Sequence, residues 1–174
     1  MKVNQLINES SLSRVWQHTQ SNRPFALLTA FRNEHTYDEN VVRNKSLAAS
    51  LKNAGYGYFY VDGYWIENEG TPEEVYVSED SIFVIGTEGG DEEFLRTIIN
   101  AGKHWDQDAV LVKANGEIGI YVDGKLDFTL QDFAAGNSSE VYTKLRNNKK
   151  SNTFIFENTR QAKGFISKFK KKEK

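Results

Sequence analysis

The chain has 174 residues, 39% of them apolar and 13% aromatic, which is enough for one sizeable core and indicates a single domain over residues 1–174. Because it has no cysteine, it can form neither a disulfide framework nor a thiolate zinc site. Its formal net charge of −2 gives no attraction of the whole chain to nucleic acid, although residues 163–174 are rich in lysine. It has no apolar run of the about 20 residues that cross a bilayer and no signal-peptide pattern at its start, so we expect a cytoplasmic protein.

In chain order, the first predicted elements are a short helix, a strand and a longer helix. Residues 3–18 carry apolar side chains at loosely helical spacing, and residues 25–32 form an apolar strand. The next helix begins at Tyr37 or Asp38 and ends at Gly55, because glycine commonly ends helices. The residues of this helix that we expect to face the core are Val41, Val42, Leu47, Ala48 and Leu51.

Two strands, a helix and a further strand follow. Residues 56–66 are aromatic and β-branched, and we expect a bulge or tight turn at Asp62-Gly63 to interrupt the strand that they form. Residues 75–85 form the next strand after a polar connection. Asp91 caps a helix that follows a glycine-rich loop. The core-facing residues of this helix are Phe94, Leu95, Ile98, Ile99 and Ala101. Residues 109–112 are an unbroken apolar strand, which suits the middle of a sheet.

The resulting order over residues 19–114, β-α-β-β-α-β, is that of a ferredoxin-like α+β fold, in which two helices cover one face of an antiparallel sheet. Residues 115–174 form a C-terminal extension that ends in the basic tail. Within it, Asp123-Gly124 is typical of a hairpin turn. The other elements that we expect in the extension are strands 117–122, 125–130 and 153–156, a helix near 139–145 and an amphipathic segment containing Phe165, Ile166 and Phe169.

The aromatic strand is apolar on both faces, because its side chains alternate between the two faces of the sheet. One face carries Tyr56, Tyr58 and Tyr60, and the other carries Gly57, Phe59 and Val61. A ferredoxin-like arrangement leaves one sheet face without helices, so that face must be covered in another way. We expect either the terminal segments or another subunit of a cyclic oligomer to cover it.

Four short motifs follow one another along the chain, with a helix containing Asn and Arg after the first. They are Phe25-Ala26-Leu27-Leu28-Thr29-Ala30-Phe31-Arg32, Tyr56-Gly57, Gly63-Tyr64-Trp65-Ile66-Glu67 and Trp105-Asp106-Gln107-Asp108. In this order the chain resembles the phage-encoded S-adenosylmethionine lyases, a family historically described as S-adenosylmethionine hydrolases. The resemblance covers roughly residues 24–113. It implies an enzyme of the host cytoplasm that depletes the methyl donor of host restriction and modification, and a homotrimer with active sites between subunits.

The chemistry that the resemblance implies is an internal displacement. The carboxylate of S-adenosylmethionine attacks its own γ-carbon, expels neutral methylthioadenosine and closes homoserine lactone. Because the nucleophile is already ionised and the leaving group is neutral, the step needs no general acid, general base, metal or cofactor. It needs a folded substrate in a poorly hydrated pocket, with an anion for the ammonium and aromatic walls for the adenine and the sulfonium. The sequence does not separate this reaction from direct hydrolysis to homoserine.

Glu67 is the first candidate for a catalytic residue, because it matches the glutamate of the family's Gly-x-x-x-Glu motif. Its carboxylate can pair with the ammonium or the sulfonium of the substrate. Without the resemblance, it is a solvated glutamate at the end of a strand, with Glu69, Glu73 and Glu74 nearby. A bulge would let Glu69 take its place, so Glu69 is a second candidate for the same role.

Tyr56 is the other catalytic candidate, since it matches the tyrosine of the family's Tyr-Gly pair and its phenol can donate a hydrogen bond to the substrate. Gly57 beside it would let a ligand approach the backbone. Gln107 matches the family glutamine and can bind the ribose or the adenine. The ordinary structural explanations are a sheet-face tyrosine and a surface-turn glutamine.

The end of the first strand supplies the remaining candidates for substrate binding, Thr29, Phe31 and Arg32. The guanidinium of Arg32 either clamps the substrate carboxylate or pairs with Asp38 or Glu39, and the structural pairing is favoured.

Two non-enzymatic interpretations stay open. A ferredoxin-like sheet with exposed aromatics can stack RNA bases while a lysine-rich tail follows the phosphates, although the glutamates around residues 67–74 would oppose a polyanion. The chain could also be an oligomeric sensor that binds a nucleotide without turnover. The glycine-rich loop 86–90 does not indicate a phosphate site, because three acidic residues follow it, and the scattered histidines do not indicate a metal site.

Overall fold

The computed structural model describes residues 18–67, 72, 75–130, 133–135, 142–145 and 153–156. The elements in chain order are β1 (Phe25–Leu28), α2 (Tyr37–Asn53), β2 (Gly57–Glu67), β3 (Val75–Ile85), α3 (Asp91–His104), β4 (Val110–Ala114), β5 (Glu117–Val122), β6 (Lys125–Leu130), β7 (Phe133–Ala135), β8 (Tyr142–Leu145) and β9 (Thr153–Phe156). No helix among these residues is long and apolar enough to cross a membrane.

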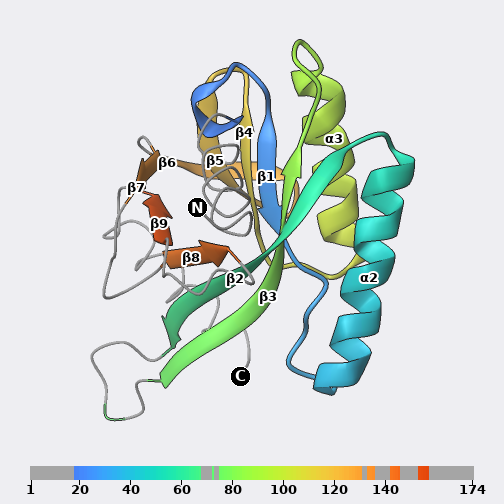
Figure 1. The fold of residues 1–174 in the computed structure, drawn as a ribbon, viewed down its shortest axis with the longest axis vertical. Coiled ribbons are helices and arrows are strands. Elements are labelled where there is room, and N and C mark those ends of the chain that lie inside the picture. Colours follow the sequence, from blue (N-terminus) through green and yellow to red (C-terminus); the bar gives the residue numbers. More distant parts are fainter. Residues whose placement is uncertain are drawn as a thin grey trace, which may run out of the picture.

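The described strands form one antiparallel sheet in the order β6-β5-β4-β1-β3-β2-β8-β9-β7. Figure 1 shows α2 and α3 packed side by side on one face, while β6 to β9 lie on the other side of the central strands. The predicted α+β class, an antiparallel sheet with a few helices, is therefore confirmed. β1 lies in the middle, between β3 and β4, so the segment that leaves its end emerges at the centre of the molecule.

Helix α2 begins at Tyr37 because Thr36 caps it. The Thr36 hydroxyl accepts a hydrogen bond from the Glu39 amide at 3.3 Å, and the Glu39 carboxylate accepts one from the Thr36 amide at 2.7 Å, which forms a capping box. The helix ends at Asn53, two residues before Gly55, whose φ of 89° suits glycine. The predicted start and end are confirmed.

The buried face of α2 differs from the prediction in its first half. Its members are Asn40, Asn44, Leu47, Ala48 and Leu51. Val42 is wrong as a core residue, because it is 62% exposed. It lies two positions from Asn40 and Asn44, and two residues turn a helix by about 200°, so it points to the opposite side. Two asparagines thus occupy the face where the sequence predicted valines.

Helix α3 buries Phe94, Ile98 and Gly102. The predicted cap at Asp91 is wrong: Gly90 occupies the N-cap position without a side-chain hydrogen bond, and Asp91 is the first helical residue. The Asp91 carboxylate instead accepts a hydrogen bond from the backbone amide of Asn115 at 2.7 Å, and so joins the start of α3 to the β4–β5 turn.

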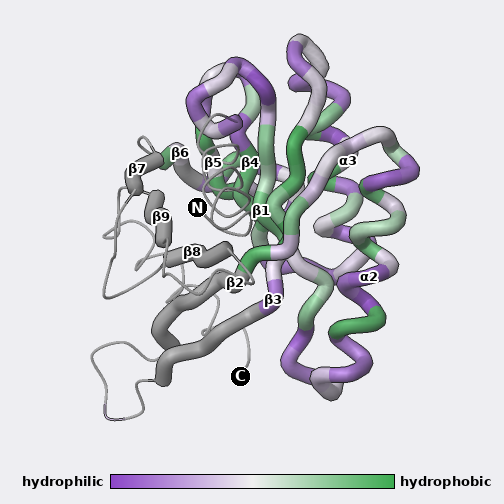
Figure 2. Tube along the Cα trace, viewed as in Figure 1, coloured by the Kyte–Doolittle hydropathy of each residue, from purple (hydrophilic) through white to green (hydrophobic). Residues whose placement is uncertain are grey.

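The sheet carries a buried cluster on each face. The helix-side cluster includes Ala26, Leu28, Ile82, Val84 and the buried apolar residues of α2 and α3. Tyr56, Tyr58 and Tyr60 pack against it. The opposite cluster consists of Phe25, Val61, Phe83, Ile85, Ile118 and Leu130, with Phe59 packed against it. The predicted alternation of the aromatic strand is confirmed. Figure 2 shows the hydrophobic residues concentrated along the central strands and the hydrophilic ones in the connecting loops.

The second sheet face is buried where the structure describes it, which agrees with the expectation that another part of the protein covers it. Phe25, Phe83 and Val61 on that face are 0% exposed, and the rings of Phe25 and Phe83 stack with centroids 5.1 Å apart. Burying one such aromatic side chain contributes about 1.5–3 kcal/mol. Ile118 and Leu130 in the same cluster come from β5 and β6, so the sheet continues beyond the four central strands and supplies part of its own cover.

Several boundaries differ from the sequence prediction. β1 pairs only as far as Leu28 rather than to residue 32. β2 passes through Asp62-Gly63 with an unshifted register against β3, so the predicted interruption is wrong. Tyr142–Leu145 is a strand and not part of a helix, because it pairs with the free edge of β2. Strand β7 was not predicted.

The hairpin at Asp123-Gly124 is confirmed, since both residues have positive φ, 50° and 79°. The strand 153–156 is confirmed as β9. Most of the predicted leading helix, residues 3–17, and the amphipathic segment with Phe165, Ile166 and Phe169 lie outside the described residues.

Candidate active site at the end of the first strand

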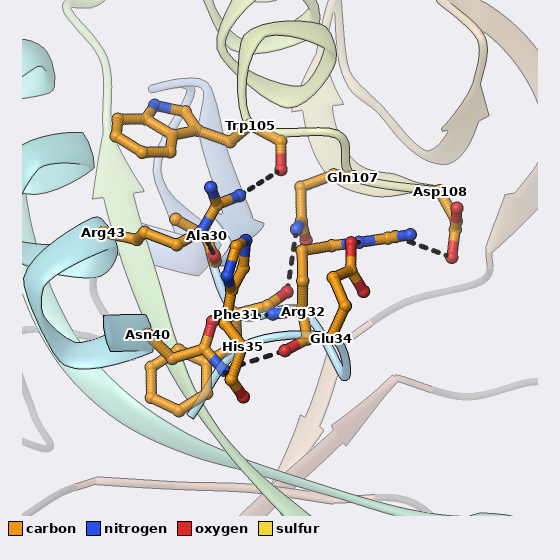
Figure 3. A network of polar contacts seen from close by, with 10 residues as sticks. All are labelled: Ala30, Phe31, Arg32, Glu34, His35, Asn40, Arg43, Trp105, Gln107 and Asp108. Atoms are coloured by element: carbon orange, nitrogen blue, oxygen red, sulfur yellow. Dashed lines mark hydrogen bonds and ion pairs between the residues drawn. The ribbon is translucent and has the colours of Figure 1, made fainter. Parts of the chain in front are cut away.

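The chain leaves the sheet after Leu28 and runs between α2 and the loop that follows α3. Figure 3 shows this junction, where residues 30–35, the α2 side chains and the loop 105–108 meet. A backbone that leaves a sheet loses its ladder partners, and buried backbone groups need replacements. Here side chains from three other places in the chain provide them.

Each backbone amide and carbonyl of residues 30–32 has a side-chain partner. Asn44 Oδ1 accepts from Ala30 N at 2.8 Å, and Arg43 Nε donates to Ala30 O at 2.8 Å. Thr29 Oγ1 accepts from Phe31 N at 3.1 Å, and Gln107 Nε2 donates to Phe31 O at 3.3 Å. Asn40 accepts from Arg32 N and donates to Arg32 O, both at 2.9 Å. The conformation of this segment is therefore fixed by side chains.

Thr29, a predicted substrate-binding residue, is 7% exposed. Its hydroxyl donates to Asp80 O at 2.7 Å while it accepts from Phe31 N. Asn44 Nδ2 donates to the same Asp80 carbonyl at 2.8 Å, so the pair joins β1, α2 and β3. The Thr29 hydroxyl is thus engaged within the chain.

Arg32 lies between two carboxylates. Its Nε is 3.1 Å from Glu34 Oε1, and its Nη1 is 3.2 Å from Asp108 Oδ2. Burial lowers the pKa of Arg32, but the hydrogen bonds and charges of Glu34 and Asp108 outweigh burial and raise it, so the guanidinium stays charged. The predicted partners Asp38 and Glu39 are wrong. The Glu39 carboxylate bonds Thr36 in the capping box instead.

Tyr56 and Gly57 do not join this cluster. Gly57 pairs with Ile85, whereas Thr29 bonds Asp80, five residues away along β3. At about 3.3 Å per residue, the two places are about 17 Å apart. The Tyr56 ring meets Phe94 edge-on, with centroids 5.1 Å apart. A Cβ at Gly57 would have no atom within 4 Å, so space for an approaching group exists there.

Glu67 lies farther away in the other direction. It is the last residue of β2 and pairs with Val75, and the structure describes only its backbone. Ten residues separate it from Gly57, which is about 33 Å along a strand. Figure 1 shows this part of the β2–β3 hairpin extending away from the helices. Glu69 lies outside the described residues. The candidates therefore occupy three separate places in one chain.

Sequence reasoning missed Asn40, Arg43, Asn44 and Trp105 as members of the cluster. The signal that could have found the three residues of α2 is polar side chains at positions i, i+3 and i+4 on the helix face that continues the leucine stripe. Asparagine on such a face has both a donor and an acceptor, which suits irregular backbone.

No group of three or more potential metal ligands occurs among the described residues. A half-open hollow lies at the other end of β1, lined by residues 20–23, Asp91, Lys113, Asn115 and Gly116. It contains none of the predicted site residues.

The sequence model of the S-adenosylmethionine lyase family matches residues 26–149, which include the whole cluster. The chain therefore belongs to the S-adenosylmethionine lyase family and is an S-adenosylmethionine-cleaving enzyme. A search of the curated proteins finds no match. Among solved structures, a phage SAM lyase in complex with S-methyl-5'-thioadenosine matches with 17% identity, over 75% of this chain and 95% of that chain. Its TM-score is 0.29, so no structural detail is carried over from it.

Proposed function

We propose that this enzyme cleaves S-adenosylmethionine by attack of the substrate carboxylate on the substrate γ-carbon. One carboxylate C–O bond to the γ-carbon forms as the C–S bond breaks, which gives homoserine lactone and methylthioadenosine without transfer of a proton. In the host cytoplasm, this reaction would deplete the methyl donor of restriction and modification. The family match over residues 26–149 is the observation that carries the proposal.

The geometry of the junction supports a reaction that depends on placement. Six backbone groups of residues 30–32 are held by side chains, so Phe31 and Arg32 project from a fixed support. Holding reacting groups in a near-attack arrangement supplies a large part of the barrier reduction in such reactions. Two opposite charges of the substrate cancel in the transition state, so a poorly hydrated pocket favours it.

In this proposal Glu67, with Glu69 as the alternative, pairs with the ammonium or sulfonium, and the Tyr56 phenol donates a hydrogen bond beside the open backbone at Gly57. Phe31 and Arg32 contact the substrate from the junction. Thr29 and Gln107, whose polar atoms already bond the chain, support the contact surface. If Arg32 binds the substrate carboxylate, its ion pair with Glu34 or with Asp108 must break.

The separation of the candidates supports active sites between subunits of a trimer. Since Gly57 and Glu67 are about 33 Å apart along β2, one chain cannot place Tyr56 and Glu67 on one substrate molecule. A cyclic trimer can bring the end of one β2–β3 hairpin to the Tyr56 region of the next subunit. The order β4-β1-β3-β2, with two helices on one face, supports a ferredoxin-like core for each subunit.

The alternative of a non-catalytic nucleotide-binding or RNA-binding module has no observation in its favour. It needs an aromatic sheet face open to bases, but Tyr58, Phe59 and Tyr60 of β2 pack against the two buried clusters.

The direct test is incubation of the purified protein with S-adenosylmethionine and detection of methylthioadenosine by chromatography. The wild type and the control Glu117→Gln, which changes an exposed glutamate on β5, should release it. Glu67→Gln should fold normally and lose at least about 100-fold in rate. No release by the folded wild type would reject the function, and full activity of Glu67→Gln would reject that residue.

The site between subunits has its own test. Tyr56→Phe and Glu67→Gln subunits, each inactive alone, are unfolded, mixed in equal amounts and refolded together. If each site takes Tyr56 from one subunit and Glu67 from the next, about a quarter of the sites regain both residues. No recovered activity, or a scattering mass equal to the 19.9 kDa of one chain, would contradict the proposal.

A further inference from the structure

Arg43 on α2 joins two segments that are far apart in the sequence. Its Nε donates to Ala30 O at 2.8 Å, and its Nη2 donates to Trp105 O at 3.1 Å. The guanidinium carbon lies 5.2 Å from the centre of the Trp105 ring, and Figure 3 shows the side chain reaching between the two carbonyls. One planar group thus contacts the end of β1, the loop after α3 and an indole face.

The neighbouring α2 side chains make a different set of contacts. Asn40 bonds Arg32 and His35, and Asn44 bonds Ala30, Thr29 and Asp80. Their recorded hydrogen bonds hold the segment 29–35 and β3, and do not extend to the loop 105–108. Among the described hydrogen bonds of α2, the contact with that loop comes from Arg43.

The loop 105–108 begins at the C-terminal end of α3, where a cation stabilises the helix and where the backbone has an unfavourable conformation. Trp105 is the C-cap of α3, and Asp106 has φ 56°, a left-handed conformation that non-glycine residues adopt at some energetic cost. Carbonyls at a helix C-terminus lack intrahelical partners and carry partial negative charge. The Arg43 guanidinium satisfies the Trp105 carbonyl from outside the helix. The recorded ion pairs of the described residues involve Arg32 and not Arg43.

Holding this loop sets the contacts that follow it. Gln107 Nε2 reaches Phe31 O, and Asp108 Oδ2 reaches Arg32 Nη1, so two further links between the segments depend on where residue 105 lies. Phe31 and Arg32 are the junction residues to which the proposed function assigns substrate contact, and the present inference rests on that assignment.

We propose that Arg43 is a positioning residue: it fixes segments 29–32 and 105–108 relative to one another and so aligns the substrate-binding groups without contacting the substrate. Arginine suits this role because its rigid fork presents two donors in fixed directions and stacks on an aromatic ring. Lysine can satisfy one of the two carbonyls at a time, so Arg43→Lys should fall between the wild type and Arg43→Ala.

The kinetic test compares full-length wild type, Arg43→Lys and Arg43→Ala with two controls. Arg96→Ala removes an exposed arginine from α3, and Ile98→Val lowers stability in the core away from the junction. Arg43→Ala should lower kcat about 100-fold while KM changes less than about 3-fold, because misplacement by about 1 Å can lower the rate to that extent. Arg43→Lys should lose about 10-fold, and the controls should stay within 2-fold of wild type.

A second measurement does not depend on activity. In a background with Trp16→Phe and Trp65→Phe, Trp105 is the remaining tryptophan, and acrylamide quenching reports how open its loop is. Arg43→Ala should raise the quenching constant about 2-fold or more, and Arg96→Ala should not change it.

The two measurements separate the possible failures. Unchanged quenching in Arg43→Ala would overturn the proposed link between the segments. Increased quenching with wild-type kcat would show a purely structural contact and overturn the positioning role. A wild type that folds but does not turn over would reject the proposed function, while the quenching result would still decide whether Arg43 joins the two segments.

Discussion

Replacement of Asn44 by alanine should lower the free energy of unfolding by more than most substitutions of a polar residue do. Asn44 is 3% exposed, accepts from Ala30 N at 2.8 Å and donates to Asp80 O at 2.8 Å. In Asn44→Ala the Asp80 carbonyl keeps its bond from Thr29, but the recorded partner of the buried Ala30 amide is lost. An unsatisfied buried amide costs about 1–3 kcal/mol and a lost hydrogen bond about 0.5–1.5 kcal/mol. We therefore expect a loss of about 3 kcal/mol.

Urea unfolding of Asn44→Ala tests this estimate, with stability taken from the midpoint at an unchanged denaturant slope. For a chain of this length, a loss of about 3 kcal/mol corresponds to a decrease of about 6–12 °C in Tm. The matched control is Asn53→Ala, the same change at an exposed position of the same helix, which should stay within about 0.5 kcal/mol. A loss below about 0.5 kcal/mol in Asn44→Ala would refute the claim that side chains hold this segment.

Three further predictions concern packing, the open backbone and pH. Gly102→Ala should destabilise by about 1–2 kcal/mol in urea, because its Cβ would lie 2.8 Å from Val110 Cγ1, and Val110→Ala in the same chain should recover most of the loss. Gly57→Ala should unfold like wild type but lower kcat/KM at least 10-fold if a ligand approaches there, and unchanged kinetics would remove Gly57 from the site. Hydrogen bonds from the Thr36 amide and hydroxyl hold the pKa of Glu39 below its ordinary value, so the capping box stabilises the fold above the ordinary value and this contribution is lost as pH falls through the lowered one. Glu39→Gln should therefore flatten the acid limb of the Tm–pH curve, and an unchanged limb would contradict this assignment.

The sequence predicts best where a local pattern alone decides the structure. The alternation of tyrosines with Phe59 and Val61 correctly assigns the two faces of β2, and Asp123-Gly124 correctly marks a turn that requires positive φ. In both cases residues close in the chain determine the outcome, so no knowledge of distant partners is needed.

Prediction from the sequence fails where residues far away in the chain determine the local structure. Residues 25–32 are apolar enough to look like one strand, yet only Phe25–Leu28 pair, because the partners of residues 30–32 are side chains from α2 and Gln107. For the same reason Asn40 and Asn44 were not predicted among the core-facing residues of α2. Their burial depends on an irregular segment that packs against them, which the helical pattern does not encode.

The sequence predicted only part of the candidate site correctly, again because contacts between distant residues decide which side chains meet. Phe31, Arg32 and Gln107 do come together, and the contact between Gln107 and Phe31 is direct. Tyr56 directly precedes β2 and Glu67 is the last residue of β2, so an extended strand places the two at opposite ends. In the proposed trimer they meet through a second chain, and the pattern of one sequence carries no information about that contact.

The measurement that tests the central chemistry most directly is turnover of S-adenosylmethionine in ¹⁸O-labelled water. Internal attack forms the new C–O bond with an oxygen of the substrate carboxylate, so lactone trapped early should be unlabelled and appear in equal amount with methylthioadenosine. Later opening of the lactone at its carbonyl should place the label in the carboxylate of homoserine. Label in the γ-hydroxyl of homoserine, as water attack on the γ-carbon requires, would contradict the account.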